Sequence, residues 1–174
     1  MLHLRELREE DKDLFLQASS CEPGCEKIYE DELASKMMWK IAMGGEGEFT
    51  YYVIGDDVSE FIGYCGVKEG NSPEICISLL KQFQGKGFGK IALQLLWDRV
   101  SKERKIIRFI ARVEEDNMYS IKMFEKLGAK KVKTEESKVL QNLREFAKEQ
   151  KNMEDILKGM EAFHKKIIQY SIEL

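Results

Sequence analysis

The sequence has little cysteine, histidine and proline. Its 174 residues include four cysteines, two histidines and two prolines. The cysteines form no Cys-x-x-Cys pair, and both histidines lie far from them along the chain. Structural metal sites need such ligands at short, regular spacings. We therefore expect no metal, and we interpret Cys65 and Cys76, which lie in apolar runs, as small core residues.

Long apolar runs and an excess of charge of one sign are also missing. The N-terminus is charged from Arg5 onward, and nowhere do about 18 apolar residues run together. The 28 basic and 31 acidic side chains give a net charge of −3. These features predict a cytoplasmic protein with no membrane partner, and they give no global attraction to nucleic acid.

What the sequence does contain is an alternation of strand and helix patterns in one domain, residues 1–174. Apolar periodicity predicts a mixed α/β sheet of about seven strands flanked by helices. The expected strands are residues 2–7, 49–55, 61–67, 74–80, 106–113, 129–134 and 166–174. The expected helices are residues 9–19, 31–43, 90–104 and 117–128.

A helical excursion, residues 135–165, is predicted before the last strand. Its two apolar stripes run from Val139 to Ala147 and from Ile156 to Phe163. They must bury either against the face of this domain where a substrate would be accepted or against a second subunit, so a homodimer is one of two alternatives. Together with the loop "CEPGCEKIYEDE", residues 21–32, the excursion is expected to shape the substrate pocket.

The most informative stretch is "QFQGKGFGK", in which three glycines lead from a strand into a helix. Glycines there allow the backbone to approach a phosphate closely. A P-loop would need a Ser or Thr after Gly89-Lys90, but Ile91 follows. A dinucleotide loop would start directly after the strand, whereas six residues separate Leu80 from Gly87. Glycines that only turn a strand into a helix are the structural alternative.

Read as Gln-x-x-Gly-x-Gly, residues 84–89 resemble the acyl-CoA pyrophosphate loop of the GNAT superfamily of N-acetyltransferases. The segments "LHLRELREEDKDLF", "FIGYCGV", "NMYSIKMFEKLGA" and "KIIQYSIEL" are similar to further elements of that family. The resemblance implies the GNAT fold and acetyl-CoA as cosubstrate. Within the family, the chain looks most similar to the branch of ribosomal-protein N-terminal acetyltransferases.

The resemblance also implies which residues bind acetyl-CoA. Backbone amides of the strand end would hold the thioester and pantetheine, the glycine loop would hold the diphosphate, and the later helix would add polar contacts. These residues are Leu79, Leu80, Lys81, Gln84, Gly85, Lys86, Gly87, Phe88, Gly89, Lys90, Asn117, Ser120 and Phe124.

Two catalytic roles follow from the same resemblance, and a third, the base, from the need to deprotonate an amine that is charged at pH 7. The amide of Leu79 would stabilise the oxyanion. Many members protonate the thiolate with a tyrosine, where this chain has Phe124, so we assign that role to Ser120, with Tyr119 as a poorer candidate. Glu74 is our first choice of base, with Glu136 or a water chain as alternatives.

These features predict an N-acetyltransferase that acts on a primary amine, either a small molecule or a protein N-terminus, by direct attack on acetyl-CoA. Cys76 as a covalent nucleophile is a weaker alternative, because no histidine lies nearby in sequence. Two other functions remain open: a noncatalytic acyl-CoA sensor of the same fold, motivated by Phe124, and a dinucleotide-dependent oxidoreductase.

Overall fold

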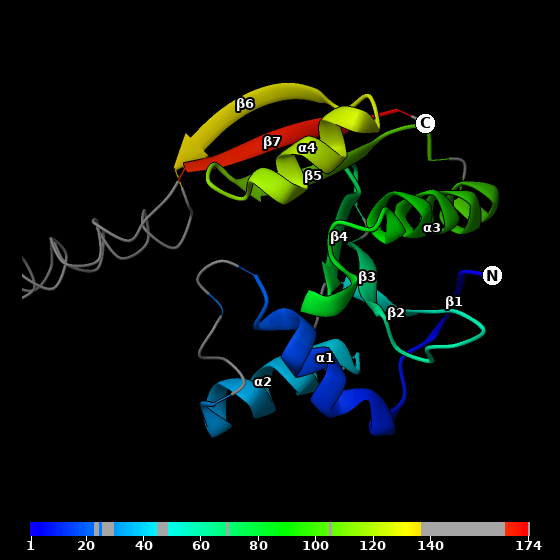
Figure 1. Ribbon diagram of the computed structural model, residues 1–174. Coiled ribbons are helices and arrows are strands. Elements are labelled where there is room, and N and C mark those ends of the chain that lie inside the picture. Colours follow the sequence, from blue (N-terminus) through cyan, green and yellow to red (C-terminus); the bar gives the residue numbers. More distant parts are fainter. Residues whose placement is uncertain are drawn as a thin grey trace, which may run out of the picture.

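The computed structural model describes residues 1–22, 25, 30–44, 49–68, 70–104, 106–136 and 166–173. Within these ranges the chain forms one mixed sheet with helices on both faces (Figure 1). The strands are β1 His3–Glu6, β2 Phe49–Gly55, β3 Gly63–Lys68, β4 Glu74–Leu79, β5 Phe109–Glu114, β6 Lys130–Glu136 and β7 Lys166–Ile172. The helices are α1 Lys12–Ser19, α2 Glu32–Ala42, α3 Phe88–Arg104 and α4 Met118–Lys126.

The seven strands and the four helices outside the excursion confirm the predicted element order. The predicted excursion itself, apart from its first two residues, lies outside the described residues. Those two residues, Glu135 and Glu136, extend β6 beyond the expected short strand.

The strand order is β1-β2-β3-β4-β5-β7-β6, so the last strand of the chain lies between β5 and β6. All neighbouring strands are antiparallel except β4 and β5, which are parallel. β1 to β4 form an antiparallel half of the sheet, and β5, β7 and β6 form the other half. Figure 1 shows the two halves in the lower and upper parts of the molecule.

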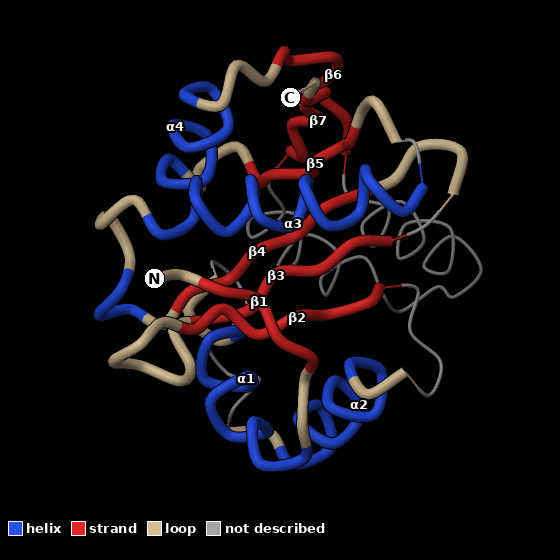
Figure 2. Tube along the Cα trace, turned by 90° about the vertical axis from the view of Figure 1, so that its right-hand side faces the viewer, coloured by secondary structure: helices blue, strands red, loops and turns tan. Residues whose placement is uncertain are grey.

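Two apolar cores lie on opposite faces of the sheet because side chains alternate along each strand. Tyr52 and Ile54 of β2 face a core built with α3 and α4. Val53, between them, faces a second core built with α1 and α2. Figure 2 shows α3 and α4 above strands β1 to β3, and α1 and α2 below them.

Local chemistry sets the helix ends. Asp31 caps α2 by accepting a hydrogen bond from the Ala34 N–H at 2.8 Å, and Asn117 caps α4 by accepting from the Ser120 N–H at 3.1 Å. Gly44 and Gly128 follow α2 and α4 with φ of +87° and +80°. Along the described parts of the chain, no helix has the length and apolarity needed to cross a membrane.

Candidate active site

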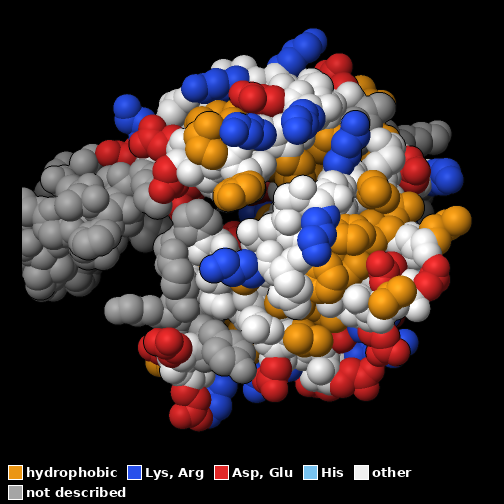
Figure 3. Space-filling view, in the orientation of Figure 1, with side chains coloured by type: hydrophobic (Ala, Val, Ile, Leu, Met, Phe, Trp, Pro, Cys, Tyr) orange, Lys and Arg blue, Asp and Glu red, His pale blue; other side chains and the backbone are white. Residues whose placement is uncertain are grey.

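The two halves of the sheet separate from each other between β4 and β5. These strands share one register pair, Glu74 with Ile110, at the start of both strands, whereas β3 and β4 pair over six residues. The strands therefore diverge toward their carboxyl ends, where Leu79 and Glu114 lie. Figure 3 shows the surface hollowed between the part that carries α4 and the part that carries α1 and α2, with Lys and Arg side chains on both sides of the hollow.

At the end of β4, the backbone N–H groups of Leu79 and Leu80 point in opposite directions. The Leu80 N–H donates to the Ile62 carbonyl at 3.0 Å, so it points toward β3. Because N–H groups alternate in direction along a strand, the Leu79 N–H is directed toward β5. The Leu80 side chain is 2% exposed in the α1 and α2 core, while Lys81 begins a 3₁₀ turn on the surface. Of the three predicted amides, Leu79 is thus directed into the divergence, and Leu80 is already bonded.

The glycine loop follows directly. Gly85 and Gly87 have φ of +72° and +87°, and a Cβ at either position would meet no atom within 4 Å. Both residues therefore have the left-handed backbone that favours glycine, and both leave open space where a ligand can reach the backbone. The exposed Lys86 and Lys90 flank Gly87 at the start of α3, whose N-terminus favours an anion. These features fit a diphosphate.

Gly89 has a different reason to be glycine. It lies buried in the first turn of α3, and a Cβ there would come within 2.6 Å of the Met123 sulfur of α4. The third glycine thus allows α3 and α4 to approach each other, so packing alone accounts for the residue type at this position.

The remaining loop residues hold the loop in shape. The Gln84 side-chain amide donates to the Leu79 carbonyl at 2.9 Å, which ties the loop to the end of β4. The Phe88 ring packs edge-on against Phe83 with centroids 5.9 Å apart, and Lys86 lies 5.9 Å from the Phe83 ring. Gln84 therefore acts on the site through the Leu79 backbone, a role that the sequence pattern did not reveal.

Helix α4 carries the other predicted contacts. Asn117 caps the helix, and Ser120 is half-buried in its first turn. Tyr119 is 77% exposed. Phe124 is 3% exposed and stacks on Tyr170 of β7 with ring centroids 6.1 Å apart, so its ring is part of the core.

Glu74, the predicted base, lies at the first residue of β4, five residues before Leu79. Its carboxylate accepts a hydrogen bond from the Arg112 guanidinium of β5. The Glu74 carboxylate is therefore held in an ion pair with Arg112, at the start of β4 and away from Leu79. Glu136, the alternative base, ends β6 opposite Lys166 of β7.

Sequence reasoning did not single out Glu22, which follows α1. Burial raises the pKa of its carboxyl to about 7, a hydrogen bond with Ser78 of β4 opposes that rise, and the negative charge of Glu114 of β5 adds to it. Glu22 therefore interacts with both diverging strands. The sequence predicted that residues 21–32 shape the substrate pocket, but it held no signal for this one carboxylate.

Cys76, also on β4, does not have the properties of a nucleophile. Burial raises the pKa of its thiol well above the ordinary value, and the negative charge of Glu22 raises it further. The reactive thiolate is therefore disfavoured. Within the described residues, no three His, Cys, Asp or Glu side chains come together as a metal site.

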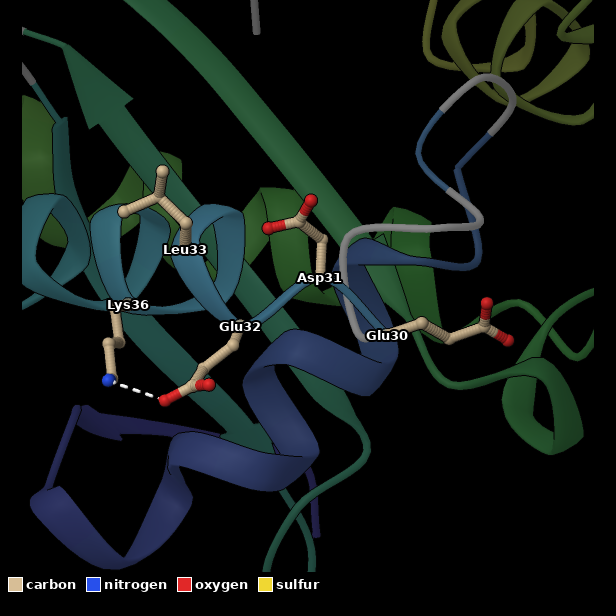
Figure 4. Close-up of a pocket in the computed structure, with 5 residues that line it drawn as sticks. All are labelled: Glu30, Asp31, Glu32, Leu33 and Lys36. Atoms are coloured by element: carbon tan, nitrogen blue, oxygen red, sulfur yellow. Dashed lines mark hydrogen bonds and ion pairs between the residues drawn. The ribbon is translucent and has the colours of Figure 1, made fainter.

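A second hollow lies at the start of α2 and is lined by Glu30, Asp31, Glu32, Leu33 and Lys36 (Figure 4). Two of its three carboxylates have partners on the same helix: Asp31 caps the helix, and Glu32 accepts a hydrogen bond from Lys36 at 2.6 Å. These contacts stabilise the helix, and the hollow lies away from the β4 and β5 divergence.

Comparisons with known proteins agree with this geometry. Residues 1–130 match the family model described as "Acetyltransferase (GNAT) domain". No curated protein sequence matches the chain.

Solved structures show the same fold. A spermidine N-acetyltransferase from Vibrio cholerae, in complex with CoA and spermine, aligns with a TM-score of 0.69 at 14% identity, over 99% of this chain and 95% of that one. A GNAT-family acetyltransferase from Bacillus anthracis aligns at 0.68 with 15% identity, over 99% and 94%. An N-acetyltransferase from Staphylococcus aureus Mu50 aligns at 0.66 with 14% identity, over 99% and 98%.

Proposed function

The chain belongs to the GNAT acetyltransferase family, and from that premise we propose that it transfers the acetyl group of acetyl-CoA to a primary amine in a ternary complex. The observation that carries the proposal is the join between β4 and α3. There, the left-handed glycines Gly85 and Gly87, with open space beside them, come one 3₁₀ turn after a strand end whose Leu79 N–H is directed toward β5. This pairs a diphosphate site with a polarising donor for a carbonyl oxygen.

Each group at this join has a proposed task. The amides of Gly85 to Gly89, with Lys86 and Lys90, bind the diphosphate at the N-terminus of α3. Acetyl-CoA supplies the activated acetyl group as a thioester. The Leu79 N–H donates to the carbonyl oxygen of that thioester, and Gln84 fixes the Leu79 peptide through its carbonyl. The proposed binding region also includes Lys81, Asn117 and Phe124. Asn117 contributes by capping α4, and Phe124 contributes by packing α4 onto Tyr170.

Ser120 is the proposed proton donor to the leaving CoA sulfur. It lies in the first turn of α4, and the capping hydrogen bond from its N–H to the Asn117 side chain fixes its backbone. This role, which replaces the family's tyrosine, supports a relation to the ribosomal-protein N-terminal acetyltransferase branch. A position in that branch is part of the proposal.

The acceptor is proposed to be a small cationic amine, with a protein N-terminus as the alternative. The Vibrio cholerae enzyme of the same fold was solved with spermine, so polyamines are the first acceptors to test. An ammonium group is almost fully charged at pH 7. Carboxylates such as Glu22 and Glu114 at the divergence would attract it.

Release of the CoA thiol from acetyl-CoA tests the proposal, with spermine, spermidine and a peptide with a free α-amine as acceptors. Calorimetry measures acetyl-CoA and NADH binding in parallel. We expect acetyl-CoA to bind, NADH not to bind, and at least one amine to release thiol. Acetyl-CoA binding with no turnover on any amine would favour a noncatalytic sensor, and NADH binding alone would favour an oxidoreductase.

A further inference from the structure

Glu22 lies in a turn that backbone hydrogen bonds fix on both sides. Its N–H donates to the Ser19 carbonyl at 3.1 Å, and its carbonyl accepts from the Cys25 N–H at 3.1 Å. The side chain extends from this turn to Ser78 of β4 and lies within electrostatic reach of Glu114 of β5. The fold thus places a carboxyl group where β4 and β5 diverge.

The hydroxyl of Ser78 contacts both the end of α1 and the Glu22 carboxyl. Ser78 is 4% exposed, and its Oγ donates to the Ala18 carbonyl at 2.7 Å. A serine hydroxyl has one proton to donate. Because that proton is donated to the Ala18 carbonyl, Ser78 compensates a charged Glu22 only in part. The hydrogen bond with Ser78 favours the charged carboxyl, but burial outweighs it and the charge of Glu114 adds to the effect of burial, so the pKa of Glu22 rises to about 7.

Other polar groups also lie near Glu22. Tyr51 of β2, Tyr64 of β3 and Cys76 of β4 all interact electrostatically with it. The Tyr64 hydroxyl and the Ser19 hydroxyl lie 3.0 Å apart and share a hydrogen bond, and Ser19 also donates to the Phe15 carbonyl. The charged group among these neighbours, Glu114, has the same sign as Glu22. Glu22 can therefore accept a proton near neutral pH, whereas the Glu74 carboxylate is paired with Arg112.

Glu22 also lies on the correct face of the sheet for an acceptor. Ile77 and Leu79 of β4 pack toward α3, where the diphosphate is proposed to bind, while Ser78 faces α1. A pantetheine arm that runs from the glycine loop into the divergence leaves the α1 face open to the attacking amine. Glu22 lies on that face.

We propose that Glu22 is the catalytic base that takes the proton from the ammonium group of the acceptor, on the α1 face of the divergence between β4 and β5. This inference rests on the proposed function. The ammonium proton moves to the Glu22 carboxylate, and the nitrogen lone pair forms the new C–N bond. The C–S bond breaks with its electron pair on sulfur, and the Ser120 hydroxyl gives its proton to the thiolate. Of the two protons then on the nitrogen, one stays in the amide product, and the other is lost and restores the proton of Ser120. Glu22 then releases its proton to water.

The test compares Glu22→Gln with Glu74→Gln, using spermine and spermidine as acceptors between pH 5.5 and 10. We expect kcat/KM of the wild-type protein to rise through an apparent pKa near 7. Glu22→Gln should lower kcat/KM at pH 7 by about 10²- to 10⁴-fold and remove that rise. The loss should shrink near pH 10, where the free amine no longer needs a base. Acetyl-CoA affinity should stay within about twofold, because the diphosphate loop is unchanged.

Several outcomes would overturn the assignment. If Glu22→Gln keeps the kcat/KM and the pH profile of the wild-type protein, Glu22 is not the base. If Glu74→Gln shows the large loss of kcat/KM instead, the base is Glu74. A ¹³C NMR titration of the glutamate carboxyls gives a readout without turnover: a Glu22 that titrates below pH 5 contradicts the proposal. If the wild-type protein binds acetyl-CoA but acetylates no amine, the proposed function fails, and the role of Glu22 fails with it.

Discussion

At the scale of single residues, a comparison of Gly87 with Gly44 distinguishes the effect of backbone strain from the effect of ligand access. Gly87 and Gly44 both have φ of +87°, and a Cβ at either would meet no atom within 4 Å. Alanine at either position should lower the free energy of unfolding by about 1–2 kcal/mol through the same strain. Gly87→Ala should also weaken acetyl-CoA binding at least about tenfold, because its Cβ occupies the proposed approach of the diphosphate. Urea unfolding and calorimetry measure the two effects. Equal acetyl-CoA affinity in both variants would contradict the loop assignment.

Ser120→Ala tests the proposed proton donor. The alanine keeps the N–H that donates to Asn117, so α4 should stay capped. We expect kcat to fall by about 10²-fold or more with little change in acetyl-CoA affinity, since general acids contribute on that scale. Thiol release and calorimetry measure the two quantities. Tyr119→Phe, at an exposed position of the same helix, is the control and should keep wild-type kcat. Equal losses of turnover and binding in Ser120→Ala would make Ser120 only a ligand contact.

Glu22 should also influence how stability depends on pH. Its pKa is about 7 in the folded protein against an ordinary 4.5, so the folded state holds the proton more tightly than the unfolded state. The stability that this proton contributes is present below pH 4.5 and is lost as the pH rises through 7. The loss is at most about 3 kcal/mol, from 1.36 kcal/mol per pKa unit.

Glu22→Gln removes this dependence because the amide does not titrate. In urea unfolding, we expect the variant to be more stable than the wild-type protein at pH 8 and close to it at pH 5. Glu6→Gln, at an exposed position of β1, is the control and should change neither value. A variant that is less stable than wild type at pH 8 would show that the Glu22 carboxyl is not strained by burial.

At the scale of elements, a buried ion pair joins β1 to the start of α1. Asp11 is 3% exposed, and its two carboxylate oxygens accept from the Arg5 guanidinium at 2.7 Å each and from the Arg8 N–H at 2.8 Å. Burial alone raises the pKa of Asp11, but these hydrogen bonds outweigh it, so the pKa lies below its ordinary value. The stability from this pair is therefore present above about pH 4 and is lost as the pH falls through the lowered pKa.

Asp11→Ala should lower the free energy of unfolding by about 3–5 kcal/mol at pH 7, because it leaves the half-buried Arg5 without its partner. Glu10→Ala is the matched control, since Glu10 forms an exposed ion pair with Arg8 at 3.3 Å. Such exposed pairs contribute little. Urea unfolding at pH 7 and pH 3 measures both variants, and the difference between them should narrow at pH 3. A difference that stays constant with pH would contradict an ionic contribution.

The elements were also what the sequence predicted best. Strands and helices such as Phe49–Gly55 and Glu32–Ala42 follow from local periodicity and from glycine or capping residues at their ends. The position of β7 between β5 and β6 could not be predicted from such patterns, since it depends on pairing between residues far apart in the chain. Glu22 was missed for the same reason, because Ser78 lies 56 residues away. The choice between burial on this domain and a second subunit depends on residues 135–165, most of which lie outside the described residues.

At the scale of the whole molecule, the two halves of the sheet are joined weakly by backbone and more strongly by α3. One register pair connects β4 and β5. Helix α3 bridges the halves: Trp97 packs edge-on against Phe109 of β5 with centroids 4.7 Å apart, and Arg99 lies 4.5 Å from the Tyr52 ring of β2. The proposed diphosphate site is at the N-terminus of this same helix. A ligand held there, with its arm between β4 and β5, would contact both halves at once.

We therefore expect CoA to stabilise the whole fold in one cooperative transition. At a CoA concentration 100 times its Kd, the gain is about 2.7 kcal/mol, which corresponds to a rise in Tm of about 5–10 °C for a chain of this size. Hydrogen exchange should slow at residues 85–90 and also in β5, because the ligand bridges the divergence. Gly87→Ala should show a much smaller rise in Tm at the same CoA concentration. Protection confined to residues 85–90, with β5 unchanged, would place the ligand on the loop but outside the divergence, since an arm bound between the strands would contact β5.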